Sequence, residues 1–290
     1  MRALWVTVLG LGATVIAGAA ALELAAARDR RRWRAPCPLD DDVPPPWPAR
    51  AVAVARRFVA ECVAIVRAAL ALLVARPAPH PDVTPRGAVV LVPGSAALAP
   101  AMRRLAGRLE GDGWMVTIAP PPWGARDLAR RAQRLAATLA AVRRAVGAAT
   151  VDVVAHGAGG LVARACLASG THAAGVGRLV TLGTPHQGSV AFRRFRLDPL
   201  AAALCPQSRA LVRLASGDRL PDVVDCTAIA SADDALTVPV ERAYWPGAFN
   251  VTIRDVGHVG LLYAPRVWEL VRENLAAPPA PTRVPASRRA

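Results

Sequence analysis

The sequence predicts an α/β fold with a mainly parallel central sheet flanked by helices. From Gly87 onward, short apolar runs that suit buried strands alternate with longer stretches of helical periodicity. Strands that alternate with helices favour parallel pairing, with helices covering both faces of the sheet. The predicted strands are Ala88–Val92, Met115–Ala119, Thr150–Ala155, Arg178–Leu182, Cys226–Ser231 and Asn250–Asp255.

Helices are predicted between these strands, for example over Ala101–Glu110 and Leu128–Val146. The second places Leu128, Leu135, Leu139 and Val142 on one face, as expected of a helix packed on a sheet. The last predicted helix spans about 265–275. Domain boundaries follow at residues 87–277 for the α/β domain and 278–290 for a tail rich in Pro and Ala, which is typical of disorder.

The N-terminal segment predicts membrane attachment. Residues 3–22 carry no charge, and this length matches the roughly 20 residues that a helix needs to cross a bilayer. We therefore expect an N-terminal transmembrane helix within residues 1–27, in the inner membrane of a bacterium. A cleaved signal peptide, giving a secreted or periplasmic protein, is the alternative, although its apolar region is usually shorter, about 7–15 residues. Arginines at residues 28–34 favour a cytoplasmic main domain by the positive-inside rule, but the general excess of Arg leaves the side of the membrane open.

Two further segments separate this anchor from the α/β domain. Residues 28–48 are rich first in Arg and then in Pro, which predicts a stiff linker. Residues 49–76 predict an amphipathic helix with an Arg-bearing face and an apolar face. This helix could pack on the main domain or lie in the membrane interface.

Composition narrows the classes of function. The chain has 36 Lys and Arg against 21 Asp and Glu, for a net charge of +15, and every positive side chain is Arg. This skew, together with abundant Ala, is typical of coding bias, so no nucleic-acid partner is expected from the charge alone. The five cysteines never form C-x-x-C, so no metal site or cofactor is predicted. Disulfide and oligomeric states stay open.

Four segments at the ends of predicted strands carry candidate chemistry. Residues 151–161 (VDVVAHGAGGL) form a strand, a tight turn of small residues and a helix, the shape of the nucleophile elbow G-x-S-x-G, with Gly157 at its central position. Residues 183–188 (GTPHQG) and 231–239 (SADDALTVP) follow the next strands. The last segment, residues 255–262 (DVGHVGLL), places His258 before the final helix. The chain order of elbow, acid and histidine is that of α/β-hydrolases.

Residues from about 87 to 275 resemble the α/β-hydrolase superfamily, specifically bacterial triacylglycerol-lipase-like esterases. The resemblance is carried by LGTPHQGS at residues 182–189, by the acid turn DALTV at 234–238 and by GHVGLL at 257–262. It implies that His258 is the general base and that Asp234 orients it, with Asp233 as the competing acid. It also implies an oxyanion hole made by the backbone N–H groups of Ala158 and Ser95.

Two departures from the family pattern weaken the expectation of catalysis. Gly157 replaces the nucleophilic Ser, and Pro93 precedes Gly94 where the family has His-Gly. Ser95 and Ser189 are the candidates for a displaced nucleophile. We expect Cys166 to lie in the core and His156 to pack and hydrogen-bond rather than to act as a nucleophile.

The resulting hypothesis is a membrane-associated, lipase/esterase-like protein that is non-catalytic or strongly impaired. Residues 191–222 occupy the place of lid helices, and their apolar content suits a membrane lipid or another acyl-type ligand. An active esterase that uses water or a displaced Ser with the His258–Asp234 pair is one alternative. An Arg-driven binder of anionic lipid or nucleic acid is the other.

Overall fold

The chain is built around one parallel six-stranded sheet. The computed structural model describes residues 86–95, 98–120, 127–168, 172–195, 199–216 and 218–277, together with residues 21, 24, 25, 27–29, 56, 59 and 63. The strand order is β2-β1-β3-β4-β5-β6, and every neighbouring pair is parallel. The strands are β1 (Ala88–Val92), β2 (Met115–Ile118), β3 (Val151–His156), β4 (Val176–Leu182), β5 (Asp225–Ser231) and β6 (Phe249–Ile253). The predicted α/β fold is therefore confirmed, and each predicted strand lies within two residues of an observed one.

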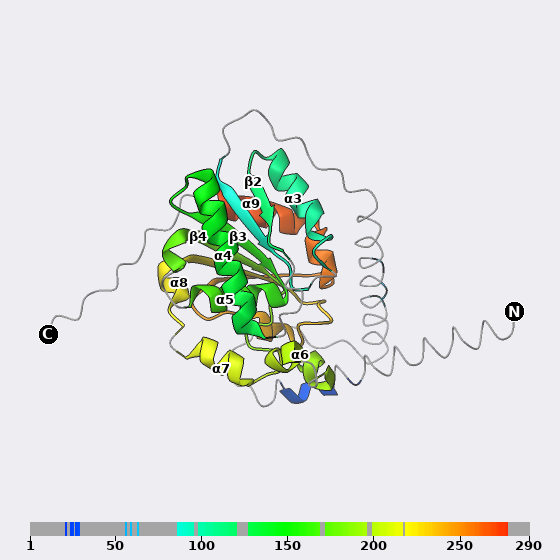
Figure 1. The fold of residues 1–290 in the computed structure, drawn as a ribbon. Coiled ribbons are helices and arrows are strands. Elements are labelled where there is room, and N and C mark those ends of the chain that lie inside the picture. Colours follow the sequence, from blue (N-terminus) through cyan, green and yellow to red (C-terminus); the bar gives the residue numbers. More distant parts are fainter. Residues whose placement is uncertain are drawn as a thin grey trace, which may run out of the picture.

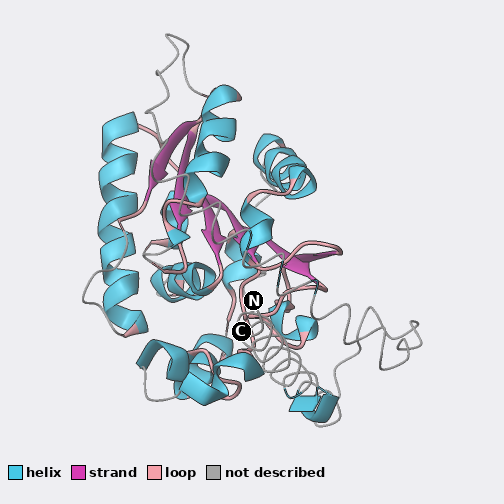
Figure 2. Cartoon of the chain, turned by 90° about the vertical axis from the view of Figure 1, so that its right-hand side faces the viewer, coloured by secondary structure: helices cyan, strands magenta, loops and turns pink. Residues whose placement is uncertain are grey.

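Helices cover both faces of this sheet (Figures 1 and 2). On one face pack α4 (Leu128–Val146), α5 (Ala158–Leu167) and α8 (Leu220–Val223), and on the other pack α3 (Met102–Gly111) and α9 (Pro265–Ala276). The central strands β1 and β3 are buried at every position, which explains their continuous apolar runs. Asp127 caps α4 by accepting a hydrogen bond from the N–H of Arg130, and Gly147 ends the helix in the left-handed conformation.

Short helices gather beyond the carboxyl ends of β4 and β5. They are η3 (Val190–Phe195), α6 (Pro199–Ala203), α7 (Arg209–Ala215) and η4 (Val240–Ala243), and η5 (Val259–Leu262) follows β6. Leucines from α6 and α7 pack on Leu161 of α5 in a separate apolar cluster. Of the short helices, η3, α6 and α7 fall at residues 190–215, in the stretch where lid helices were predicted, whereas η4 and η5 lie outside it.

The direction in which successive strands are added to the sheet reverses between β1 and β3. The chain runs from β1 outward to β2, then crosses back to β3 and continues to β6. In open parallel sheets, ligands bind outside the carboxyl ends of the strands at this reversal. The turns that follow β1 and β3 therefore mark where a functional site is expected.

Several sequence predictions concern residues outside this description. Apart from Ala21, the predicted span at residues 3–22 is not among the described residues, and the 28–48 linker and the tail are almost wholly outside them. Within the part of the chain that the structure describes, no helix has the length and apolar character to cross a membrane.

Candidate functional site

The turn between β3 and α5 is held in a conformation that suits glycine. Gly157 has φ 54° and ψ −127°, where a Cβ atom is strained. Its N–H donates to the carbonyl of Leu182 at 2.8 Å, and its own carbonyl accepts from the Thr184 hydroxyl at 2.9 Å. The turn is thus fixed to the end of β4, and its geometry does not depend on the side chain at 157.

The loop after β1 lies directly against this turn. A Cβ atom added to Gly94 would lie 2.8 Å from the carbonyl oxygen of His156 and 3.0 Å from the nitrogen of Ala158. Only a residue without a side chain allows so close an approach. The structure therefore brings the Pro93–Ser95 loop beside the N-terminus of α5, and the two predicted oxyanion donors belong to adjoining segments.

His258 and Asp234 form a buried hydrogen-bonded pair. The Nδ1 atom of His258 lies 2.7 Å from Oδ2 of Asp234, and the two side chains are 6% and 1% exposed. The other carboxylate oxygen, Oδ1, accepts from the N–H groups of Leu236 and Thr237 at 2.7 and 2.8 Å. Burial alone would raise the pKa of Asp234, but the charge of His258 and these three hydrogen bonds together lower it. Asp234 is therefore a carboxylate at neutral pH.

The imidazole of His258 lies against Gly157. A Cβ atom added to Gly157 would lie 2.9 Å from Nε2 of His258, the ring nitrogen that does not face Asp234. The three residues that the sequence singled out thus converge in space, although 101 positions separate Gly157 from His258.

His156 lies beneath His258 in the same cluster. Its Nε2 donates to the backbone carbonyl of His258 at 2.9 Å, and the two ring centroids are 4.5 Å apart. Burial, and then the charge of His258, lower the pKa of His156 to about 3, so this imidazole is neutral at physiological pH. Its position fits a role in holding the His258 backbone.

The other candidate residues have different partners. The Ser189 hydroxyl is fully buried; it donates to the carbonyl of Val238 at 3.2 Å and accepts from the Val238 N–H at 2.9 Å, so it is directed away from His258. Asp233 accepts from the N–H of Asp255 at 2.6 Å rather than from His258. Burial raises the pKa of the Cys166 thiol to about 12, which leaves it an unreactive core residue.

A buried polar cluster beside the site was not assigned any role from the sequence. His186, in the turn after β4, contacts Arg164 at 3.2 Å and the Thr181 hydroxyl at 2.9 Å, and it stacks on Trp245. Arg164 also forms an ion pair with Asp218 at 2.5 Å, and the Trp245 indole donates to the same carboxylate. The signal available in the sequence was an Arg in the otherwise apolar stretch of α5. This cluster joins α5 to the segment that follows α7.

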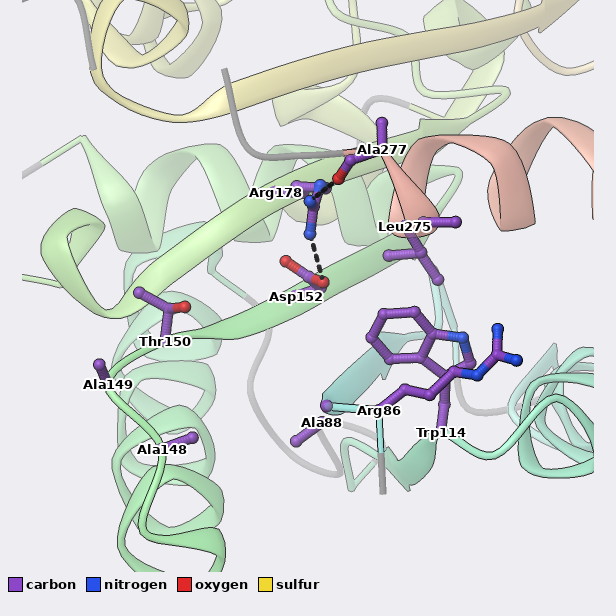
Figure 3. Close-up of a pocket in the computed structure, with 12 residues that line it drawn as sticks. Arg86, Ala88, Trp114, Ala148, Ala149, Thr150, Asp152, Arg178, Leu275 and Ala277 are labelled. Carbon is purple, nitrogen blue, oxygen red and sulfur yellow. Dashed lines mark hydrogen bonds and ion pairs between the residues drawn. The ribbon is translucent and has the colours of Figure 1, made fainter. Parts of the chain in front are cut away.

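One cavity among the described residues lies away from this site. It has a volume of about 590 Å³ and lies at the amino ends of the strands, where Arg86, Trp114 and the Asp152–Arg178 ion pair line it (Figure 3). None of the predicted site residues lines it. Among the described residues, no group of His, Cys, Asp and Glu side chains could hold a metal ion.

Comparison with known proteins supports the fold. Residues 124–227 match a family profile described as "PGAP1-like alpha/beta domain". Among solved structures, lipase B of Aspergillus fumigatus aligns with a TM-score of 0.56 at 18% identity, over 72% of this chain and 58% of that protein. The chain has the α/β-hydrolase fold. The mature lipase BlEst2 of Bacillus licheniformis aligns with a TM-score of 0.52 at 19% identity, over 69% of this chain and 96% of that one.

These likenesses establish the fold and leave activity open. The chain spans less than two thirds of the fungal lipase, and a search of curated protein sequences finds no significant match.

Proposed function

We propose that this chain is a membrane-associated, lipase/esterase-like α/β-hydrolase protein whose nucleophile position is occupied by Gly157. On this proposal the protein binds a membrane lipid or another acyl-type ligand and is non-catalytic or strongly impaired as a carboxylic-ester hydrolase. The anchor predicted at residues 3–22 supplies the membrane association.

The observation that supports this proposal is the position of His258 over Gly157. A serine at residue 157 would place its Cβ, and hence its hydroxyl, against Nε2 of His258, while Asp234 holds Nδ1. That is the arrangement in which a histidine removes a proton from an attacking hydroxyl. Glycine provides no oxygen atom for the attack, so no acyl-enzyme can form at this position.

Restoring the serine tests the proposal. We expect the natural protein to show no hydrolysis of short acyl esters above background, and Gly157→Ser to gain a low activity that His258→Ala removes. The gain should be small because a Cβ at 2.9 Å requires the imidazole to withdraw by a few tenths of an ångström. Gly107→Ser is the matched control, since no atom lies within 4 Å of its added Cβ.

The first of the following results would contradict the proposal, and the second would contradict the view that glycine at residue 157 alone accounts for the missing activity. If the natural protein hydrolyses esters and His258→Ala abolishes that activity, the centre is functional. If Gly157→Ser folds and gains nothing, the loss of function extends beyond the nucleophile, for example to the loop at Pro93, and the restored triad is not sufficient.

Direct hydrolysis by water is the second candidate, and the intact His258–Asp234 hydrogen bond favours it. His258 would take a proton from a water molecule, whose oxygen attacks the ester carbonyl to give a tetrahedral intermediate. Collapse of that intermediate would break the acyl C–O bond, and the protonated His258 would return the proton to the leaving alcohol, giving a carboxylic acid and an alcohol. This route forms no covalent intermediate with the protein, so a fluorophosphonate probe would leave the natural protein unlabelled while ester hydrolysis continued. Labelling of the natural protein would instead indicate a displaced serine.

A further inference from the structure

The N-terminal segment is bound to the α/β domain through a buried carboxylate. Residues 21, 24, 25 and 27–29 are helical, and Asp29 is 4% exposed. Its carboxylate lies 2.5 Å from Nε of Arg242 and 3.4 Å from an Nη atom of Arg193. Arg242 is itself fixed, because its guanidinium also donates to the carbonyl of Gln187 at 2.6 Å. A buried carboxylate is costly unless it is paired, so this contact specifies one docking position.

The docking position lies at the carboxyl edge of the sheet. Ala25 packs against Val190, at the start of η3, and against Val238, four residues after Asp234. Ser189 links these two segments through its hydrogen bonds to the Val238 backbone. The N-terminal segment therefore docks on the loops that hold the acid of the candidate site. In Figure 1 its described residues are dark blue, at the lower edge of the molecule where α6 and α7 also lie.

The distance along the helix limits how far this edge can lie from a membrane. Ala21 is at the end of the predicted span, and Asp29 follows it by eight residues. At about 1.5 Å per residue, these positions are only about 12 Å apart along a helix. The headgroup layer on one side of a bilayer is itself roughly 5–8 Å thick.

We propose that the Asp29–Arg242 contact turns the carboxyl edge of the sheet, with the candidate site, toward the lipid bilayer. The inference rests on the membrane anchor of the proposed function. The partner of this edge is the membrane surface, and an acyl-type ligand reaches the site from the bilayer rather than from bulk water.

The side chains exposed on this edge suit such a partner. Leu24 is 62% exposed, Val212 of α7 is 53% exposed, and Leu236, in the acid turn at residues 234–238, is 39% exposed. Arg193 of η3, which contacts Asp29, is half exposed. Apolar side chains with nearby arginines are typical of surfaces that lie in the headgroup region of a bilayer.

Fluorescence quenching by labelled lipids tests the orientation. The full chain, with Cys37 and Cys62 replaced by Ser, receives one added cysteine at Leu236 on the carboxyl edge or at Thr150 on the amino edge. The three other cysteines, Cys166, Cys205 and Cys226, are buried, and the chain without an added cysteine is the labelling control. Each of the two variants is labelled with a fluorophore and reconstituted in phosphatidylcholine vesicles that contain nitroxide-headgroup lipid. We expect at least a threefold stronger quenching at position 236 than at position 150, because a strand of six residues separates the two edges by about 20 Å.

The same measurement tests the contact itself. Asp29→Asn should reduce the difference between the two positions by half or more while the protein stays in the vesicles. Asp222→Asn removes the same charge from an exposed site in α8 and should change nothing. Equal quenching at both positions, stronger quenching at position 150, or an unaltered difference in Asp29→Asn would overturn the inference. Release of the protein from vesicles by alkaline carbonate would instead refute the anchor, and with it the membrane part of the proposed function.

Discussion

Replacing Gly157 by alanine tests the geometry at the centre of this site. The added Cβ meets two costs that can be separated. A non-glycine residue in such a backbone conformation costs about 1–3 kcal/mol. The Cβ also lies 2.9 Å from Nε2 and 3.3 Å from Cε1 of His258, and overpacking of this kind costs about 1–3 kcal/mol. We therefore expect Gly157→Ala to lower the free energy of unfolding by about 2–6 kcal/mol.

A double-mutant cycle with His258→Ala separates the two costs. Removing the imidazole relieves its close contact with the added Cβ and leaves only the cost of the strained backbone conformation. The loss of stability caused by Gly157→Ala should therefore fall to about 1–3 kcal/mol when His258 is already alanine. The assay is urea unfolding followed by circular dichroism, with all four chains at one pH. Gly107→Ala in α3 is the control; its Cβ meets nothing within 4 Å, and it should stabilise the chain by up to about 1 kcal/mol.

The cycle can refute the reasoning in two ways. An unchanged stability in Gly157→Ala would mean that the turn does not have the positive φ that the structure shows. An equal penalty with and without His258 would mean that the imidazole does not lie over residue 157, and the proposed relation between histidine and nucleophile position would be lost.

Three further predictions concern the buried polar groups. The folded chain keeps the pKa of His156 at about 3, so between pH 6.5 and 3 only the unfolded chain protonates this imidazole. The free energy of unfolding should therefore fall by about 1.4 kcal/mol for each unit by which the pH is lowered in that window because of this residue. Urea titrations should show a weaker dependence of that free energy on pH in His156→Gln. Arg164→Met leaves the Asp218 carboxylate without its ion pair and should cost about 3 kcal/mol in the same assay, and adding Asp218→Asn should recover part of it; a neutral Arg164→Met would contradict the network. Cys166 should resist iodoacetamide in the folded chain and react after unfolding, as followed by peptide mass spectrometry, and rapid modification of the native protein would show that its burial is wrong.

The strands could be predicted because their signal is local. Each of the six is a short, mostly apolar run bounded by turn residues or by a helical stretch. In the central strands β1 and β3, burial on both faces favours apolar residues at most positions. The helix Leu128–Val146 was predicted to the residue from its apolar periodicity, and the structure shows why its ends lie there, since Asp127 caps its start and Gly147 ends it. Local patterns of this kind do not depend on the rest of the chain.

That the three site residues lie close together in space could be predicted only from the topology of the sheet. Gly157, Asp234 and His258 each follow a parallel strand, and parallel strands bring their carboxyl ends to one edge of the sheet. The preference for Asp234 over Asp233 rested on the resemblance. In the structure the two carboxylates point to different partners, His258 and the N–H of Asp255.

The polar cluster around His186 and the docking of Asp29 could not be predicted in this way. Arg164 and Asp218 are 54 positions apart, and Asp29 and Arg242 are 213 apart. In a chain with 36 arginines, a single Arg carries little information about which carboxylate it meets. Such pairs are specified by packing of the whole domain, and no periodicity or motif in the sequence predicts them.

The persistence of the His258–Asp234 pair beside a glycine has a structural explanation that needs no catalysis. Asp234 Oδ1 holds the acid loop through the N–H groups of Leu236 and Thr237, and the backbone carbonyl of His258 is the acceptor for buried His156. Removing either partner of the pair would leave the other buried without its hydrogen bond, at a cost of several kcal/mol. Loss of the nucleophile, by contrast, exposes no buried polar group and relieves backbone strain at residue 157. A hydrolase that ceased to act on esters would therefore lose its serine more readily than its histidine and aspartate, so the intact pair alone is weak evidence for activity.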